Sequence, residues 1–302
     1  MDSILKETRV RRVVIFSRDE LKQYEMAQVY PGDERLRFFI GDVRDATRLQ
    51  RAFDGVDIVV HAAALKQIPA TEYNPIEAVH TNIQGAENVI NAAIDRGVDR
   101  VIALSTDKAS SPVNLYGATK LVSDKLFVAG NAYAASGRTR IAVVRYGNVI
   151  GSRGSVVPHF RKLADAGSLP ITDPRMSRFW LTLRHGIAFI CDNLARMRGG
   201  EIFVPKLPSM RIVDLARAIA PDAEIEIVGI RPGEKLHEEM ISATDARHSL
   251  DMGDYYVIEP EMAWWPKGQL QGSPLPDGFA YSSDTNERWL SIEDLRKILQ
   301  EP

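Results

Sequence analysis

The first half of the chain alternates short apolar runs with stretches of helical periodicity, and this alternation constrains the fold more than any other feature. Five runs are rich in valine and isoleucine and almost continuously apolar, as parallel strands covered on both faces should be. These runs are 13–16, 38–40, 58–61, 101–104 and 141–144. Because helical patterns lie between them, we expect a parallel sheet with right-handed crossovers. The predicted fold class is α/β, with the doubly wound parallel sheet of a dinucleotide-binding domain.

The pattern loosens after about Asn148, where glycine and proline become frequent and the predicted elements shorten. We expect helices over 46–53, 76–96 and 116–135 in the first half, and over 212–220 and 292–299 in the second, with a strand at 224–228. Residues 1–148 are predicted to form an incomplete dinucleotide-binding domain. Residues 149–302 are predicted to form a smaller substrate-binding portion, with a segment near 178–204 returning to the first domain.

Composition excludes several classes of function. The formal net charge is -2 and no block of like charge is present, so neither a nucleic acid nor a membrane surface is an expected partner. A single cysteine, Cys191, and six scattered histidines suggest neither disulfides nor a metal site. No apolar run approaches the roughly 18 residues of a membrane span, and the charged N-terminus is unlike a signal peptide. We therefore expect a cytoplasmic protein.

The front of the expected domain differs from the usual pattern. A dinucleotide-binding fold opens with a strand, a glycine-rich turn and a helix whose N-terminus receives the pyrophosphate. No such glycine cluster precedes the run at 13–16. We therefore expect a sheet that lacks strand 1 and the glycine loop, with two unpaired interior strand edges. The preferred explanation is that the natural chain starts upstream, and the alternative is a cofactor-free relative with another role.

One polar constellation stands at the centre of the chain. Ser105, Thr106, Asp107 and Lys108 directly follow a buried strand, so their side chains should emerge at the carboxyl edge of the sheet, where ligands bind in such folds. Tyr116 and Lys120 follow on one face of a predicted helix. An ammonium group near a phenol favours the phenolate, and this predicts a lowered pKa for the tyrosine. The Tyr-x-x-x-Lys spacing alone is a weak signal, and its position after the strand strengthens it.

These residues carry a resemblance to a known family. The stretches 105–109 and 114–120 resemble the inverting UDP-N-acetylglucosamine 4,6-dehydratases, which are extended short-chain dehydrogenases/reductases with a Rossmann-like fold. Further similar stretches follow in order at 17–26, 62–66, 145–149, 151–158, 178–180, 204–206 and 231–235. A related retaining, membrane-bound group commonly has methionine where Tyr116 stands. The resemblance implies an enzyme, a lyase that opens pseudaminic acid and polysaccharide biosynthesis and generally assembles into homo-oligomers.

The resemblance also implies the catalytic roles. Tyr116 would take the proton of the sugar 4-hydroxyl, Lys120 would assist it, and Thr106 would hydrogen-bond the 4-oxygen. Lys108 would remove the proton of carbon 5, and Asp107 would protonate the departing 6-hydroxyl. For these roles Lys108 must spend time neutral and Asp107 must be protonated at that moment.

The cofactor implied by the resemblance is a nicotinamide dinucleotide. Ser17 and Arg18 occupy the turn where an NAD enzyme usually carries an acid, and a guanidinium there suits a 2'-phosphate. We therefore expect NADP, with NAD as the alternative. The full set of expected cofactor-binding residues is Ser17, Arg18, Asp42, Val43, Ala62, Ala63, Ala64, Lys66, Asn82, Tyr116 and Lys120.

The substrate implied by the resemblance is a UDP-sugar. Arg231 and Glu234 correspond to the contacts of the family with nucleotide phosphate and ribose. The expected substrate-binding residues are Lys66, Tyr146, Asn148, Arg153, Val156, Lys206, Met210, Arg231 and Glu234.

Two other functions remain open at this point. One is a truncated, cofactor-free, non-catalytic fragment or partner-binding protein. The other is a nucleotide-sugar 4-epimerase of the same fold. An epimerase needs the Tyr116 and Lys120 pair, but it has no use for a base at Lys108 beside an acid at Asp107.

Overall fold

A seven-stranded sheet forms the centre of the computed structural model, which describes residues 2–134, 137–151, 155–164, 167–266, 268 and 270–300. The strand order is β15 (Ser273–Pro274), β13 (Ser249–Asp251), β14 (Tyr255–Ile258), β9 (Ile202–Pro205), β5 (Arg140–Tyr146), β4 (Arg100–Thr106) and β3 (Ile58–His61). Strands β3, β4, β5 and β9 are parallel, and β14, β13 and β15 extend the sheet antiparallel. Residues after 178 thus return to the sheet through β9.

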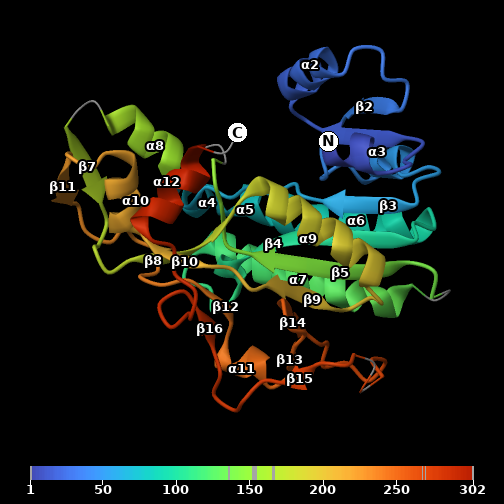
Figure 1. The fold of residues 1–302 in the computed structure, drawn as a ribbon. Coiled ribbons are helices and arrows are strands. Elements are labelled where there is room, and N and C mark those ends of the chain that lie inside the picture. Colours follow the sequence, from blue (N-terminus) through green and yellow to red (C-terminus); the bar gives the residue numbers. More distant parts are fainter. Residues whose placement is uncertain are drawn as a thin grey trace.

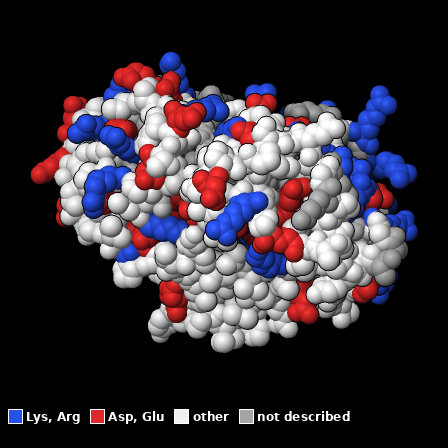
Figure 2. Space-filling model, turned by 90° about the horizontal axis from the view of Figure 1, so that it is seen from below, with Lys and Arg blue, Asp and Glu red and all other residues white. Residues whose placement is uncertain are grey.

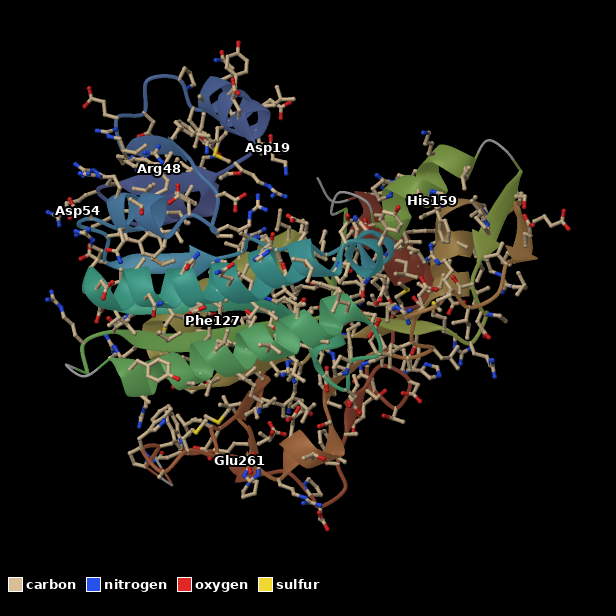
Figure 3. The ribbon with its side chains drawn as sticks, turned by 180° about the vertical axis from the view of Figure 1, so that it is seen from behind. Asp19, Arg48, Asp54, Phe127, His159 and Glu261 are labelled. Carbon is tan, nitrogen blue, oxygen red and sulfur yellow. The ribbon has the colours of Figure 1, made fainter. Side chains whose placement is uncertain are left out.

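Helices cover both faces of this sheet (Figure 1). On one face α6 (Gly85–Asp95) and α7 (Leu115–Tyr133) lie side by side, as Figure 3 shows with Phe127 marking α7. On the other face lies α9 (Leu183–Arg196). Alternate residues of β4 enter different cores: Val101 packs with Phe127, whereas Ile102 packs with residues of α9. This layering confirms the predicted doubly wound fold.

The first two strands stand apart from the large sheet. Within the described part of the chain, β1 (Val13–Ser17) pairs only with β2 (Leu36–Ile40), in parallel. Helices α1 (Asp2–Glu7), α2 (Glu20–Val29) and α3 (Ala46–Ala52) accompany the two strands. Among the described residues, no strand pairs with the second edge of β1 or with the outer edge of β3. Ile58 and Val60, which share one face of β3, are 48% and 42% exposed, and Ile40 of β2 is 53% exposed. The prediction that every apolar run is buried on both faces is wrong for these three residues.

A smaller part of the molecule has a core of its own. It contains a sheet of β6 (Asn148–Val149), β8 (Ser177–Leu181) and β10 (Ser209–Arg211), and a pair formed by β7 (Ser168–Ile171) and β11 (Glu224–Ile227). Helices α8 (Val156–Leu163), α10 (Ile212–Ile219) and α12 (Ile292–Gln300) pack around Phe160, Leu169 and Leu215. β12 (Glu239–Ile241), α11 (Ala243–Ala246) and β16 (Tyr281–Ser282) complete the chain.

The long helix predicted over 76–96 is interrupted. After α4 (Ile68–Tyr73), the chain forms α5 (Pro75–Ala78), a π-helical segment η1 (Val79–Gln84) and then α6. Asn82 lies in the π-helical segment and is buried. Such segments inside α-helices are uncommon and often lie at functional sites.

The surface agrees with the even charge balance. On the face shown in Figure 2, lysine and arginine lie interspersed with aspartate and glutamate. Within the described ranges, no helix is long and apolar enough to cross a membrane.

Candidate active site

The polar residues at the end of β4 form a connected group. Thr106 and Asp107 are almost fully buried, and the 3₁₀ turn η2 (Asp107–Ala109) carries Lys108. The Thr106 hydroxyl donates to Asp107 Oδ1 at 2.9 Å, and Lys108 Nζ donates to the same oxygen at 3.0 Å. The other carboxylate oxygen, Oδ2, accepts no hydrogen bond from the described residues. As predicted, these side chains gather at the carboxyl edge of a parallel strand.

Helix α7 begins against this turn because of its first residues. Asn114 caps the helix by accepting a hydrogen bond from the Gly117 N–H at 2.8 Å. A Cβ atom on Gly117 would lie 2.2 Å from the carbonyl oxygen of Lys108. Only glycine therefore permits this close approach, which brings Tyr116 to the residues at the end of β4. The Asn114 amide also donates to the Gly233 carbonyl at 2.8 Å, linking the helix start to the 231–235 turn.

The predicted lowering of the Tyr116 pKa by Lys120 is not what the structure shows. Burial raises the pKa of Tyr116 to about 12, and the opposing influences are the Lys108 charge and a hydrogen bond with Thr106. Burial also lowers the pKa of Lys120, with Asp124 acting in the opposite direction. Lys120 is buried, and the Asp124 charge favours its charged form against the effect of burial.

Lys120 belongs to a buried charge network that the sequence did not predict. Asp124 Oδ2 accepts from the Ser105 hydroxyl at 2.7 Å and from Arg145 Nη2 at 3.4 Å. Arg145 also donates to the Met240 carbonyl at 2.9 Å. Asp124 and Arg145 are 1% and 2% exposed, so the network ties α7, β4 and β5 to β12 without help from solvent. Arg145 did stand in a family-like stretch, but nothing in its spacing marks it as buried.

A cavity of about 660 Å³ opens beside Lys108. Six of the predicted residues line it, namely Lys108, Asn148, Val156, Met210, Arg231 and Glu234. Figure 3 labels His159, which contributes to the same wall from α8. Five lining side chains are lysine or arginine and two are glutamate, a surplus of positive charge that suits a diphosphate.

Three predicted substrate-binding residues, Lys66, Tyr146 and Lys206, do not line this cavity, and the position of a fourth is not described. Lys206 Nζ pairs with both Asp251 oxygens at 2.7 and 2.8 Å, and it does not line the cavity. Lys66 is exposed and also lies outside the cavity lining. Tyr146 is close enough to Tyr116 to raise its pKa, although it does not line the cavity either. Arg153 lies outside the described residues.

The cavity is also lined by three charged residues that were not predicted from the sequence as substrate-binding residues. Arg178, Lys235 and Glu238 line it, and the Glu238 carboxylate lies 3.0 Å from Lys108 Nζ. Arg178 and Lys235 stood in family-like stretches, but Glu238 did not. The residues next to Glu238 in the sequence do not indicate that it contacts Lys108. Only the tertiary structure shows this contact.

The predicted adenosine-side residues lie together at the ends of β1 and β2. Arg18 Nη1 lies 3.5 Å from Asp42 Oδ2, and Arg44 donates to the same oxygen at 2.8 Å. The Arg18 side chain is 55% exposed, so it is free to meet a phosphate. Ser17 accepts from the Asp19 N–H, and Val43 is buried. Ala62 and Ala63 are exposed after β3, and Ala64 is half-buried.

Asn82, another predicted cofactor-binding residue, is buried and makes its hydrogen bonds within the protein. Its amide donates to the Leu65 carbonyl and the Thr119 hydroxyl, and its oxygen accepts from the Leu65 N–H. It thus fastens the loop after β3 to α7. The described residues fit the two ends of a nicotinamide dinucleotide, at Arg18 with Asp42 and at Tyr116 with Lys120. They include no glycine-rich cradle for the pyrophosphate between these ends.

Comparison with known proteins shows to which family the chain belongs. The pattern of the polysaccharide biosynthesis protein family matches residues 1–260. The chain belongs to this family. The inverting UDP-N-acetylglucosamine 4,6-dehydratase of Campylobacter jejuni is 53% identical over 98% of this chain and 91% of that protein. The resemblance inferred from the sequence is thereby confirmed.

Two other kinds of relative are also similar to this chain. A UDP-glucose 4-epimerase of Rickettsia akari is 39% identical over 96% of this chain and 87% of its own length. Among solved structures, Pen from Bacillus thuringiensis superposes with a TM-score of 0.88 at 34% identity, covering 96% of this chain and 88% of that chain. DesIV, a dTDP-glucose 4,6-dehydratase from Streptomyces venezuelae with NAD bound, gives 0.69 at 27% identity, covering 78% and 80%.

Proposed function

We propose that this protein catalyses the inverting 4,6-dehydration of UDP-N-acetylglucosamine, with inversion at carbon 5. The observation that carries the proposal is the contact between Asp107 and Lys108, an acid and a base beside one cavity, with Tyr116 next to them. The similarity to the Campylobacter jejuni dehydratase supports the same reaction. The product would be a 4-keto-6-deoxy sugar nucleotide.

Tyr116 and Thr106 serve the first step of this reaction. Tyr116 accepts the proton of the 4-hydroxyl, and the Thr106 hydroxyl holds the 4-oxygen. A nicotinamide cofactor, which Arg18, Asp42, Tyr116 and Lys120 would hold, would supply the hydride acceptor and donor for this reaction. Because burial raises the pKa of Tyr116, the Lys108 charge is needed to stabilise its phenolate.

Lys108 and Asp107 serve the elimination. The new ketone acidifies the proton on carbon 5, and Lys108 removes it. Asp107 protonates the departing 6-hydroxyl, so water leaves across carbons 5 and 6. After hydride addition at carbon 6, Lys108 returns a proton to the opposite face of carbon 5, which inverts this centre. Transfer of the Lys108 proton to Asp107 Oδ1, 3.0 Å away, produces the required base and the required acid together.

The cavity residues support a UDP-sugar as substrate. Arg231, paired with Glu234, is 69% exposed and faces the cavity with its donors available to a diphosphate. We further propose NADP as cofactor, because Arg18 carries a guanidinium where a 2'-phosphate would bind. The cytoplasmic location, the homo-oligomeric state and the place in pseudaminic acid biosynthesis stay predictions from the sequence.

The test is proton NMR of UDP-N-acetylglucosamine incubated with the protein and NADP⁺ in heavy water. The dehydratase produces a sugar methyl signal, deuterium at carbon 5 and an inverted ring geometry. A 4-epimerase, favoured by the Rickettsia akari relative, would invert carbon 4 and form no methyl group. No reaction, either from this chain or from a version preceded by a strand and glycine-rich turn, would contradict the enzymatic proposal and favour the non-catalytic alternative.

A further inference from the structure

Lys108 lies between two buried carboxylates that come from distant parts of the chain. Its Nζ atom is 3.0 Å from Asp107 Oδ1 and 3.0 Å from Glu238 Oε1. Asp107 is the preceding residue, whereas Glu238 directly precedes β12. Glu238 is 2% exposed and Lys108 is 21% exposed, so water screens this contact little.

The backbone of Glu238 is held firmly. Its N–H donates to the Ser283 hydroxyl at 2.9 Å, and its carbonyl accepts from the Ser283 N–H at 2.8 Å. The Ser283 hydroxyl is in turn 2.8 Å from that of Ser177. A buried residue fixed in this way presents its side chain in one place, and Glu238 presents its carboxylate to Lys108 and the cavity.

The Glu238 carboxylate offsets part of the positive charge of the lysines and arginine around it. The described charged groups that act on Lys108 and Lys235 here are Asp107 and Glu238, together with the cation Arg178 and the nearby Glu239. Burial opposes the charge on Lys108, but Asp107 and Glu238 outweigh it and hold the pKa of Lys108 above its usual value. Without Glu238, Asp107 would be the one carboxylate left within 3.0 Å of Lys108 Nζ among the described residues, and Glu239 would remain as the other negative charge acting on Lys235.

We propose that Glu238 is a positioning residue for the dehydration, and that its fixed carboxylate holds Lys108 Nζ against Asp107. This inference rests on the proposed function. When the Lys108 proton moves to Asp107 Oδ1, the ammonium becomes an amine and the carboxylate becomes an acid, with no change in total charge. Glu238 accepts an N–H hydrogen bond from either form of Lys108, so Nζ stays in place before and after the transfer.

Replacing Glu238 by glutamine removes the charge and keeps the shape. Arg178 should keep its place, because it also donates to the carbonyls of Ser177, Lys235 and Leu236. The matched control is Glu239→Gln, since Glu239 accepts hydrogen bonds from Ser110 and Ser111 and not from Lys108.

The first measurement needs no activity. Acetylation of Lys108 by acetic anhydride is followed by mass spectrometry between pH 6 and pH 10, with the exposed Lys125 as internal reference. In Glu238→Gln the rate at Lys108 should rise by about tenfold or more, the change expected when one opposite charge in contact is lost. Glu239→Gln should leave it unchanged, and Glu238→Asp should lie between. Equal rates in the unmodified protein and in Glu238→Gln would overturn the proposal.

The second measurement follows the reaction. In Glu238→Gln, the maximal rate of deuterium incorporation at carbon 5 should fall, because Lys108 Nζ is no longer held against Asp107. The pH profile of this rate should move to lower pH, because the pKa of Lys108 falls, while KM for the UDP-sugar stays within about twofold of the unmodified value. A matching loss of carbon 5 exchange and substrate binding would mark Glu238 as a merely structural residue and contradict the proposal. If the unmodified protein forms no product, the proposed function fails, while the acetylation result still decides whether Glu238 governs Lys108.

Discussion

The carboxyl end of β4 and the β1–β2 pair hold the two halves of the proposed chemistry, and they are built differently. At β4, Thr106 and Asp107 are nearly buried and are joined by hydrogen bonds to each other and to Lys108. At β1, every residue is only partly buried, and Arg18 makes one long contact with Asp42. The acid–base groups are therefore fixed by the fold, whereas Arg18 keeps the freedom to adapt to a ligand.

Because of this difference, the proposed catalytic residues and the proposed cofactor-binding residues should respond differently to substitution. Buried polar groups with several hydrogen-bond partners keep their positions unless one of those partners is removed. Exposed groups contribute little until a ligand orders them. Substitutions near β4 should therefore have large effects, and substitutions near β1 should have small ones.

The largest expected effect is on the reaction itself. Tyr116→Phe removes the proton acceptor for the 4-hydroxyl and should lower kcat by about 10²–10⁴-fold. Since the pKa of Tyr116 is raised to about 12, the phenolate fraction of the unmodified protein should grow as pH rises from neutral, and kcat should grow with it. Methyl formation measured by NMR at several pH values checks both statements. Tyr133→Phe, at an exposed tyrosine of the same helix, is the control and should leave kcat unaltered.

A large loss of stability is expected from the buried charge network. Arg145→Met leaves Asp124 without its guanidinium partner and should lower the free energy of unfolding by about 3–5 kcal/mol. Thermal or urea unfolding measures this loss. Arg175→Met removes a guanidinium that is 70% exposed from its pair with Asp173, and should cost less than about 1 kcal/mol. Equal losses in the two variants would show that the buried network contributes no more to stability than the pair of Arg175 with Asp173.

A smaller loss is expected from crowding at the start of α7. In Gly117→Ala the new Cβ would meet the Lys108 carbonyl, so the helix must shift, at a cost of about 1–3 kcal/mol. The shift separates Tyr116 from Thr106, and kcat should fall more than KM rises. Gly186→Ala on α9 meets only the Leu181 side chain at 3.3 Å and provides the control. A Gly117→Ala protein with full activity would show that the close approach is dispensable.

The smallest expected effect lies at β1. Arg18→Ala should weaken NADPH binding by no more than about fivefold, because exposed charge contacts are worth about 0.2–1 kcal/mol. NADH binding should not change, and fluorescence titration of both cofactors measures the difference. Equal weakening of both would argue against a 2'-phosphate contact. Failure of the unmodified protein to bind either cofactor would favour the cofactor-free alternative.

The sequence predicted those features that depend on local pattern. Buried strands such as β4, the helix carrying Tyr116 and Lys120, and the position of Thr106 and Asp107 at a strand end all follow from periodicity and topology. The sequence could not predict that Glu238 meets Lys108, because that contact joins residues 130 positions apart. It also misjudged Ile58 and Val60, since burial depends on which neighbours are present and not on apolarity alone.

The π-helical segment η1 has a consequence for insertions and deletions. A π turn contains one more residue than an α turn, and one residue corresponds to about 100° of helical rotation. Deleting Ile83 would replace the π turn by an α turn with one residue fewer, so α5 and α6 could keep their relative orientation. The residues inside the segment would turn, however, and Asn82 would lose its hydrogen bonds with Leu65. The length of this segment is therefore constrained more strictly than the identity of most residues in it.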